Sequence, residues 1–243
     1  MLTSEPIIPI MIKSALILTC EHGVNTIPAQ FTQLFAEDKA ILDTHRGIDI
    51  GAKVIADHLA KHLPCIFYHA ATVSRLLIDC NRKLNNKHCF SEWSRDLSSE
   101  EKQHIIDMYY RPFRESVINA IGTLIHQKKH VLHLSIHSFT PVLYEKVRTA
   151  EIGLLYDPKR TLEKDTAATL KRALETLTPH YRIRLNYPYL GTSDGFTTFL
   201  RQQFAAKTYI GLEIETNQAL MTSEHTQQAL IKQLTTAIAT LDF

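Results

Sequence analysis

Two histidines follow short apolar runs of the chain, at places where a buried strand would end. His22 comes shortly after Ala15–Thr19, and His137 comes directly after Val131–Ile136. A catalytic zinc ion takes three nitrogen or oxygen ligands from the protein and leaves one position open for water. Because the chain has 13 histidines, either residue could also be an ordinary core or surface side chain. The pair makes a metal site our working hypothesis.

Two glutamates belong to a third apolar run, Tyr209–Ile214. Glu213 lies within this run, and Glu215 follows its end. Because successive side chains of a strand point to opposite faces, the two carboxylates would share one face. A carboxylate beside a metal ion can take the proton of the water that the metal activates. Histidine, histidine and glutamate thus come from three separate predicted strands.

A third metal ligand has two candidates, His45 and Asp49. Both lie in the predicted helix Ile41–His62 and are four residues apart, hence on one helical face. Gly47 and Gly51 would let this backbone approach a sheet closely. The alternative is a local hydrogen bond between the two side chains without any metal. Both residues therefore stay open as ligands.

Two arginines flank a short apolar run within Ser74–Arg82. The planar guanidinium groups of Arg75 and Arg82 suit bidentate binding of a carboxylate, which would hold an anionic substrate near a metal. Asp79 lies between them. The alternative is that one arginine forms an ion pair with this aspartate in the core.

Short apolar runs are the elements expected to position these residues. Sites in open α/β sheets form at the carboxyl ends of strands, so the side chains after each run should meet. The runs are mostly continuous rather than alternating, as in strands buried on both faces. The predicted strands are Ala15–Thr19, Cys65–Tyr68, Val131–Ile136, Ile152–Tyr156, Arg182–Leu185 and Tyr209–Ile214.

Helical patterns separate the runs, which predicts a mostly parallel sheet covered on both sides. Ser98 and Glu101 form a candidate capping box, Pro112 should kink or divide its helix, and Ser223 is a candidate N-cap. The predicted helices are Ile41–His62, Ser99–Gln127, Leu162–Leu177 and Glu224–Leu241.

The composition fits one globular domain over residues 1–243. Hydrophobic residues make up 44% and charged residues 21%, enough to bury a core. The net charge of +2 and the lack of a dense Lys/Arg stripe argue against nucleic acid as a partner. The chain has no run of about 18 apolar residues, so no membrane-spanning helix is predicted. Four cysteines without a Cys-x-x-Cys pair favour free thiols in a reducing cytoplasm.

These residues, taken together, resemble the N-formylglutamate amidohydrolase family. The similar motifs run in the family's order from about residue 15 to residue 220. They are Cys20–Gly23, His45 with Asp49–Ala52, Ser74–Arg82, His137–Pro141, Gly153–Tyr156, Pro188–Tyr189 and Leu212–Glu215.

The resemblance implies a fold, a reaction and a cofactor. The fold would be α/β with three layers, a mixed, mainly parallel sheet between helices, as in the zinc carboxypeptidases and aspartoacylases (the phosphorylase/hydrolase-like type). The reaction would be hydrolysis of N-formyl-L-glutamate, a small-molecule substrate, to formate and glutamate. One Zn²⁺ would be the cofactor. By this likeness His22 and His137 would be metal ligands, completed by His45 or Asp49.

The resemblance also implies roles around the substrate. Asn81 and Arg82 are similar to an Asn–Arg pair that holds a substrate carboxylate. Glu213 is similar to a general base on the last strand, with Glu215 as the alternative.

Three further residues complete the expected substrate site. Arg75 and Arg148 would assist in binding the carboxylates, and Tyr189 would close over the substrate.

Two positions depart from the relatives. Asn25 stands where the wider carboxypeptidase-like group has a glutamate ligand, and Glu215 stands where some relatives have arginine. The Cys-Glu-His form of residues 20–22 resembles a less defined branch of the family. Three alternatives therefore remain: a zinc deacylase or carboxypeptidase-like enzyme with another N-acyl amino acid, a non-catalytic binder of acidic ligands, and a structural α/β protein.

Overall fold

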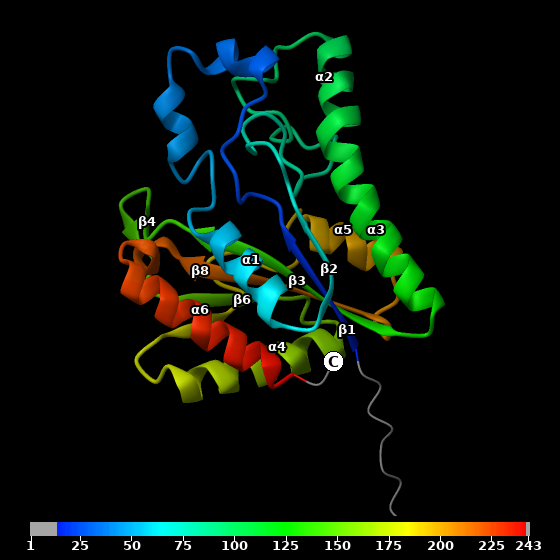
Figure 1. Cartoon of the computed structure of the whole chain (residues 1–243), viewed down its shortest axis with the longest axis vertical. Coiled ribbons are helices and arrows are strands. Elements are labelled where there is room, and N and C mark those ends of the chain that lie inside the picture. Colours follow the sequence, from blue (N-terminus) through cyan, green and yellow to red (C-terminus); the bar gives the residue numbers. More distant parts are fainter. Residues whose placement is uncertain (1–13, 242–243) are drawn as a thin grey trace, which may run out of the picture.

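The computed structural model describes residues 14–241, and one six-stranded sheet runs through this part of the chain (Figure 1). Its strand order is β2-β1-β3-β8-β6-β7. The strands are β1 (Ser14–Cys20), β2 (Cys65–Ala70), β3 (His130–Phe139), β6 (Ile152–Leu155), β7 (Ile183–Leu185) and β8 (Tyr209–Asn217).

The sheet is mixed and mainly parallel, as predicted. Strands β2, β1, β3 and β8 pair in parallel, whereas β6 pairs antiparallel with β8 and parallel with β7. The carboxyl ends of β1, β3 and β8 therefore meet at one edge. In the register of β3 and β8, His137 lies beside Glu215 and Ser135 lies beside Glu213.

Helices cover both faces of the sheet and complete three layers (Figure 1). On one face, leucines of β1 and β3 pack with buried residues of three helices, and on the other face Ile17 and Val131 pack with two more. The first group is α1 (Ala52–His62), α4 (Thr161–Leu177) and α6 (Glu224–Ala239); the second is α3 (Arg111–His126) and α5 (Phe196–Gln203). The predicted three-layer α/β fold is confirmed.

All six predicted strands are present, and four of them (β1, β2, β3 and β8) are longer than the apolar runs. Strand β3 continues to Phe139 and β8 continues to Asn217, so His137, Glu213 and Glu215 lie inside strands. The sequence did not predict α5 or the two-stranded hairpin of β4 (Val142–Leu143) and β5 (Lys146–Val147). Three short 3-10 helices span Ala29–Phe35, Lys39–Asp43 and Gln218–Met221.

The predicted helix over Ser99–Gln127 is present with an interruption. Helix α2 (Ser99–Ile105) begins with the expected capping box of Ser98 and Glu101, and a π-helical turn (Ile106–Tyr110) joins it to α3. Pro112 follows this turn in the first turn of α3, where its missing N–H matters least. Ser223 likewise caps α6, accepting a hydrogen bond from the backbone N–H of Thr226.

The predicted helix over Ile41–His62 is wrong in its first half. A short 3-10 helix ends at Asp43, and α1 begins only at Ala52. Gly51 adopts a φ of +83°, which ends any helix entering from the amino-terminal side. His45 and Asp49 therefore lie on a connecting turn, not on one helical face.

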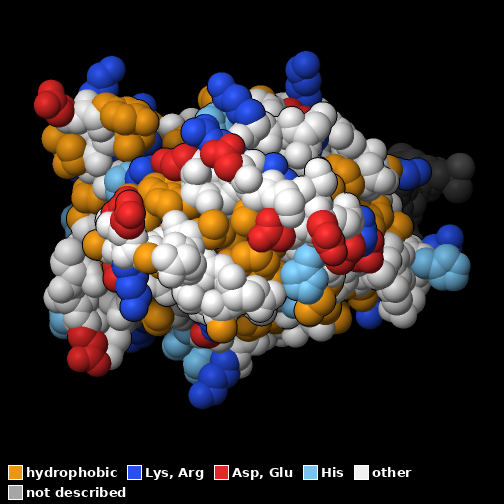
Figure 2. Space-filling model, turned by 90° about the horizontal axis from the view of Figure 1, so that it is seen from above, with side chains coloured by type: hydrophobic (Ala, Val, Ile, Leu, Met, Phe, Trp, Pro, Cys, Tyr) orange, Lys and Arg blue, Asp and Glu red, His pale blue; other side chains and the backbone are white. Residues whose placement is uncertain are grey.

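Charged side chains of both signs are intermixed on the face drawn in Figure 2. Apolar side chains are scattered among them on that face. Within residues 14–241, no helix has the length and hydropathy needed to span a bilayer.

Candidate metal centre and active site

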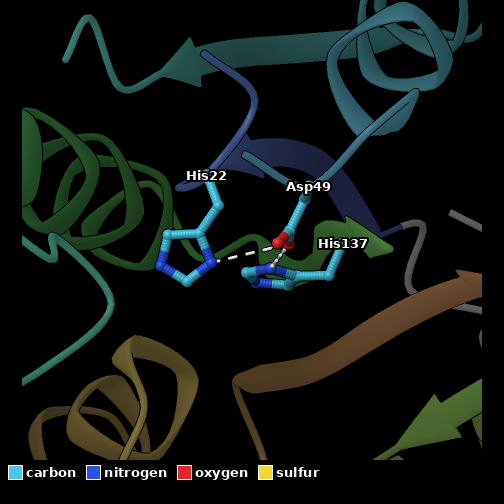
Figure 3. A group of neighbouring side chains, drawn as sticks. All are labelled: His22, Asp49 and His137. Carbon is cyan, nitrogen blue, oxygen red and sulfur yellow. Dashed lines mark hydrogen bonds and ion pairs between the residues drawn. The ribbon is translucent and has the colours of Figure 1, made fainter. Parts of the chain in front are cut away.

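A buried group of three side chains could hold a metal ion at the carboxyl edge of the sheet. His22 follows β1, His137 lies in β3, and Asp49 lies on the turn before α1. One ligand atom from each lies within 4.8 Å of the other two (Figure 3). In Figure 3 both imidazole rings turn towards the Asp49 carboxylate. Two nitrogens and one oxygen form a donor set that zinc takes.

Each imidazole contacts neighbouring side chains through its Nε2 atom, and its Nδ1 atom faces the Asp49 carboxylate. His22 Nε2 lies 2.7 Å from Asp79 Oδ1, and His137 Nε2 lies 2.9 Å from Ser135 Oγ and 3.2 Å from Glu21 Oε2. Metal-binding histidines usually carry such partners on the other ring nitrogen.

The Nδ1 atoms of the two histidines both approach Asp49 Oδ2. The distances are 3.5 Å for His22 and 2.8 Å for His137. His22 Nδ1 is buried and has no hydrogen-bond partner among the described residues. A buried nitrogen without a partner is costly unless a ligand satisfies it, so the residues fit a bound metal ion.

The carboxylates around this group are held in their ionised form. Burial alone would raise their pKa values, but His22 and His137 hold the pKa of Asp49 well below its usual range. His22 and Arg75 do the same for the pKa of Asp79. Hydrogen bonds and the charge of His137 lower the pKa of Glu21 to about 2.

Of the two candidates for a third ligand, the structure brings Asp49 to the histidines. His45 lines the neighbouring cavity but does not belong to the group of ligand atoms. Asn25 is turned elsewhere, since its amide donates a hydrogen bond of 2.6 Å to the exposed Asp43 carboxylate. Asp49 is therefore the residue that adds an oxygen ligand atom to the two histidines.

A cavity of about 230 Å³ opens beside the metal group. Its walls bring together ten of the eleven residues that the sequence singled out for the site. These are His22, His45, Asp49, Arg75, Asn81, Arg82, His137, Tyr189, Glu213 and Glu215.

The two glutamates of β8 differ in their surroundings. The Thr197 hydroxyl of α5 donates a hydrogen bond to Glu213 Oε1. Glu215 Oε2 is buried and has no hydrogen-bond partner among the described residues. Burial raises the pKa of Glu215 to about 8, and the negative charges of Asp49 and Glu213 add to this effect against that of His137.

Arg75 and Arg82 line the cavity and also contact Asp79, so the alternative of an internal ion pair is present too. Arg75 donates to Asp79 Oδ2 at 3.1 Å and to Asp49 Oδ1 at 3.4 Å. Arg82 Nε lies 3.9 Å from Asp79 Oδ2, and its Nη1 donates to the backbone oxygen of Asp194. Arg75 is therefore already engaged by two carboxylates, whereas Arg82 is more loosely held.

Arg148 is the one predicted site residue that the structure does not bring to the cavity wall. Its guanidinium lies 5.0 Å from the ring centroid of Tyr189 and 5.7 Å from that of Phe139, two residues that do line the cavity. Arg148 therefore packs against two residues of the cavity wall without lining the cavity itself. Tyr189 itself is 44% exposed at the mouth.

Sequence reasoning missed the residues whose side chains contact and orient the two histidines and Glu213. Glu21 and Ser135 contact His137, Asp79 contacts His22, and Thr197 contacts Glu213. One signal was available: Glu21 and Asp79 are acidic residues inside or beside apolar runs, where an unpaired charge would be costly.

A family model described as N-formylglutamate amidohydrolase matches residues 14–222 of the chain. The chain belongs to this family. Its membership confirms the family resemblance and makes the protein an amidohydrolase. No curated protein matches the sequence of this amidohydrolase at a significant level.

Two solved structures are similar to this amidohydrolase over most of its length. A gene product of Agrobacterium tumefaciens is 27% identical with a TM-score of 0.74, covering 93% of this chain and 91% of its own. The N-formylglutamate amidohydrolase of Ralstonia eutropha JMP134 is 22% identical with a TM-score of 0.67, covering 93% of both chains. The second likeness supports the fold.

Proposed function

We propose that this amidohydrolase uses a divalent metal ion, Zn²⁺, to hydrolyse the amide bond of an N-formyl or N-acyl amino acid. N-formyl-L-glutamate is the substrate that the family suggests, with formate and glutamate as products. The observation that carries the proposal is the buried group of His22, Asp49 and His137. It opens into the same cavity as two glutamates and two arginines.

His22, Asp49 and His137 would hold the metal through two Nδ1 atoms and one carboxylate oxygen. Bound there, the ion supplies Lewis acidity, which activates water and polarises the scissile carbonyl group. Asp79 and Glu21 keep the two imidazole rings turned so that Nδ1 faces the site. Arg75 occupies Asp49 Oδ1 and leaves Oδ2 for the centre.

Glu213 is the residue that we assign as general base. It lies on the cavity wall, and Thr197 fixes Oε1, the only one of its two carboxylate oxygens with a hydrogen-bond partner among the described residues. The other oxygen can take the proton of the attacking water and later pass it to the leaving amine. Glu215, which lies beside His137 in the sheet, is the alternative base.

The substrate carboxylates would bind to the arginine side of the cavity. Arg82 is 31% exposed there and only loosely paired with Asp79, so its guanidinium can form charge-assisted hydrogen bonds with a carboxylate. Asn81 stands beside it, its Oδ1 fixed by the backbone N–H of Phe196 at 2.6 Å. Arg75 contributes positive charge, and Tyr189 covers the mouth.

The size of the cavity supports a small substrate. Pockets for drug-sized ligands usually exceed about 300 Å³, whereas this one measures about 230 Å³. A single acylated amino acid is a better match than a peptide. The four unpaired cysteines, all among the described residues, support a reducing compartment such as the cytoplasm.

The proposed substrate class predicts that the zinc-loaded protein hydrolyses N-formyl-L-glutamate faster than N-formyl-L-leucine. Arg82→Ala should lower kcat/KM for N-formyl-L-glutamate by about 10- to 100-fold, because a hydrogen bond to a charged group is lost. Arg95→Ala, at an arginine that is 63% exposed, is the matched control and should leave kcat/KM unchanged. The measurement is formate or amine release under initial-rate conditions.

Other results of these assays would favour one of the alternative functions. Faster cleavage of N-acetyl than of N-formyl substrates would favour a deacylase with another acyl group. Binding of N-formyl-L-glutamate without any turnover in the presence of zinc would favour a non-catalytic binder. Equal rates for the glutamate and leucine substrates would contradict the role of Arg82.

A further inference from the structure

A line of buried polar side chains runs along the sheet away from the metal group. It starts at Glu21, beside His137, and passes through Thr19 and His133 to Tyr209. All four side chains of the line are nearly inaccessible, at 0% to 1% exposed. Thr19, His133 and Tyr209 come from β1, β3 and β8, which lie side by side in Figure 1, and Glu21 follows the end of β1.

The contacts along this line are short. Thr19 Oγ1 lies 2.6 Å from Glu21 Oε1 and 2.9 Å from His133 Nε2. His133 Nδ1 lies 2.7 Å from the Tyr209 hydroxyl. At the other end, Glu21 Oε2 accepts a hydrogen bond of 2.6 Å from Ser135 and lies 3.2 Å from His137 Nε2.

Only one arrangement of protons satisfies every contact. The single Thr19 hydroxyl proton goes to the Glu21 carboxylate, so Thr19 must accept the Nε2–H of His133. His133 Nδ1 then accepts the hydroxyl proton of Tyr209. Burial lowers the pKa of His133 to about 4, which fits a neutral ring with one N–H. The line therefore points in one direction, towards Glu21.

The same reasoning sets the proton on the ligand histidine. Ser135 gives its hydroxyl proton to Glu21, so Ser135 Oγ accepts from His137 Nε2. With Nε2 as the donor, His137 turns Nδ1 towards Asp49. Both carboxylate oxygens of Glu21 accept hydrogen bonds, so Glu21 is held in place and in turn orients the His137 ring.

A glycine makes room for the far end of the line. A Cβ atom at Gly211 would lie 2.7 Å from the Tyr209 hydroxyl and 3.0 Å from its ring. Gly211 is also the register partner of His133 on β8. The absence of a side chain there lets the tyrosine ring lie along the sheet and reach His133.

The line has no contact with the cavity. Thr19, His133 and Tyr209 do not line it, and Tyr209 belongs to the buried apolar cluster that includes residues of α3 and α5. Burying polar groups in such a place costs free energy, which apolar residues of similar size would avoid. The hydrogen bond from Thr19 to Glu21 is the side-chain contact that joins this line to the site.

We propose that Thr19, His133 and Tyr209 are positioning residues that fix Glu21 and thereby aim His137 Nδ1 at the metal. The inference rests on the proposed metal site. It predicts that removing one hydroxyl from this line weakens metal binding although no ligand and no cavity residue is changed.

The test compares two substitutions at Thr19 in the full chain. Thr19→Val removes the hydroxyl and keeps the shape, and Thr19→Ser restores the hydroxyl. Zinc affinity is measured by competition with a chromophoric chelator, and Co²⁺ absorption reports the ligand geometry. We expect Thr19→Val to bind zinc about tenfold more weakly, because changes to the partners of ligand histidines cost about 10- to 100-fold. Thr19→Ser should stay close to the unchanged protein.

Leu134→Val is the matched control for a merely structural effect. Leu134 is fully buried next to Ser135 but belongs to the core on the opposite face of the sheet. It should lower stability to urea without changing zinc affinity. Tyr209→Phe gives a second reading at the far end of the line and should also weaken zinc binding.

Equal zinc affinity of Thr19→Val, Tyr209→Phe and the unchanged protein would overturn the inference, as would an equal loss in Leu134→Val. These results differ from failure of the proposed function, in which the unchanged protein itself would not bind zinc.

Discussion

At the scale of single residues, the site depends on two carboxylates that do not themselves line the cavity. Glu21 holds His137, and Asp79 holds His22. Both acids are buried and kept ionised by their partners. The two histidines could be predicted because each follows a short apolar run of the sequence. Their partners could not be assigned, because Asp79 is 57 residues away from His22 in the sequence.

The two glutamates of β8 can be separated by substitution. Glu213→Gln should lower kcat by about 10²- to 10⁴-fold, because it removes the proposed general base, and should leave zinc content unchanged. Glu215→Gln should lower kcat less. Steady-state kinetics with each zinc-loaded variant is the measurement. A larger loss in Glu215→Gln would assign the base to Glu215 instead.

At the scale of elements, apolar runs predicted the strands better than the turns. Strands β1, β3, β6 and β8 are buried almost continuously, and this property is visible in the sequence as apolar runs. The outer strands β2 and β7 are only partly buried, but their runs were still recognised. Helix α5 is only eight residues long and follows a Gly- and Ser-containing loop, which hid its start. The β4–β5 hairpin has two-residue strands with largely exposed side chains, so its pattern carries no burial signal.

The turn that carries Asp49 shows why the helix prediction over Ile41–His62 failed. Apolar residues follow a helical spacing there, but glycines interrupt the helical conformation of the backbone. A Cβ atom at Gly47 would lie 2.4 Å from the backbone oxygen of Leu42, so only glycine fits this close approach. The Gly47 oxygen also accepts a hydrogen bond of 2.9 Å from Ser74, which ties the turn to the segment of Arg75.

This turn gives a prediction for stability and metal binding together. Gly47→Ala should destabilise the protein by more than about 1 kcal/mol, because the Leu42 backbone must move, and should weaken zinc binding through Asp49. Gly122→Ala in α3, where nothing lies within 4 Å of the new Cβ, should instead stabilise it by about 0.5–1 kcal/mol. Urea unfolding and zinc titration check both; unchanged zinc affinity in Gly47→Ala would count against the turn's role.

At the scale of the whole molecule, the site is assembled by topology. Parallel pairing of β1, β3 and β8 brings residues near 20, 137 and 215 to one edge, and the segment of residues 189–195 closes the other side of the cavity. The sequence shows which strands exist, but their order depends on long-range packing. For this reason the family motifs, rather than the spacing of residues, carried the prediction of a shared site.

Metal content is the most direct measurement of the central claim. The unchanged protein, purified without chelators and then supplied with zinc, should hold a stoichiometric amount of zinc by elemental analysis and hydrolyse N-formyl-L-glutamate. Asp49→Ala should lose both zinc and activity, whereas His45→Ala should keep its zinc, because His45 lies outside the ligand group. Stoichiometric zinc in Asp49→Ala, or little zinc in the unchanged protein, would contradict the account.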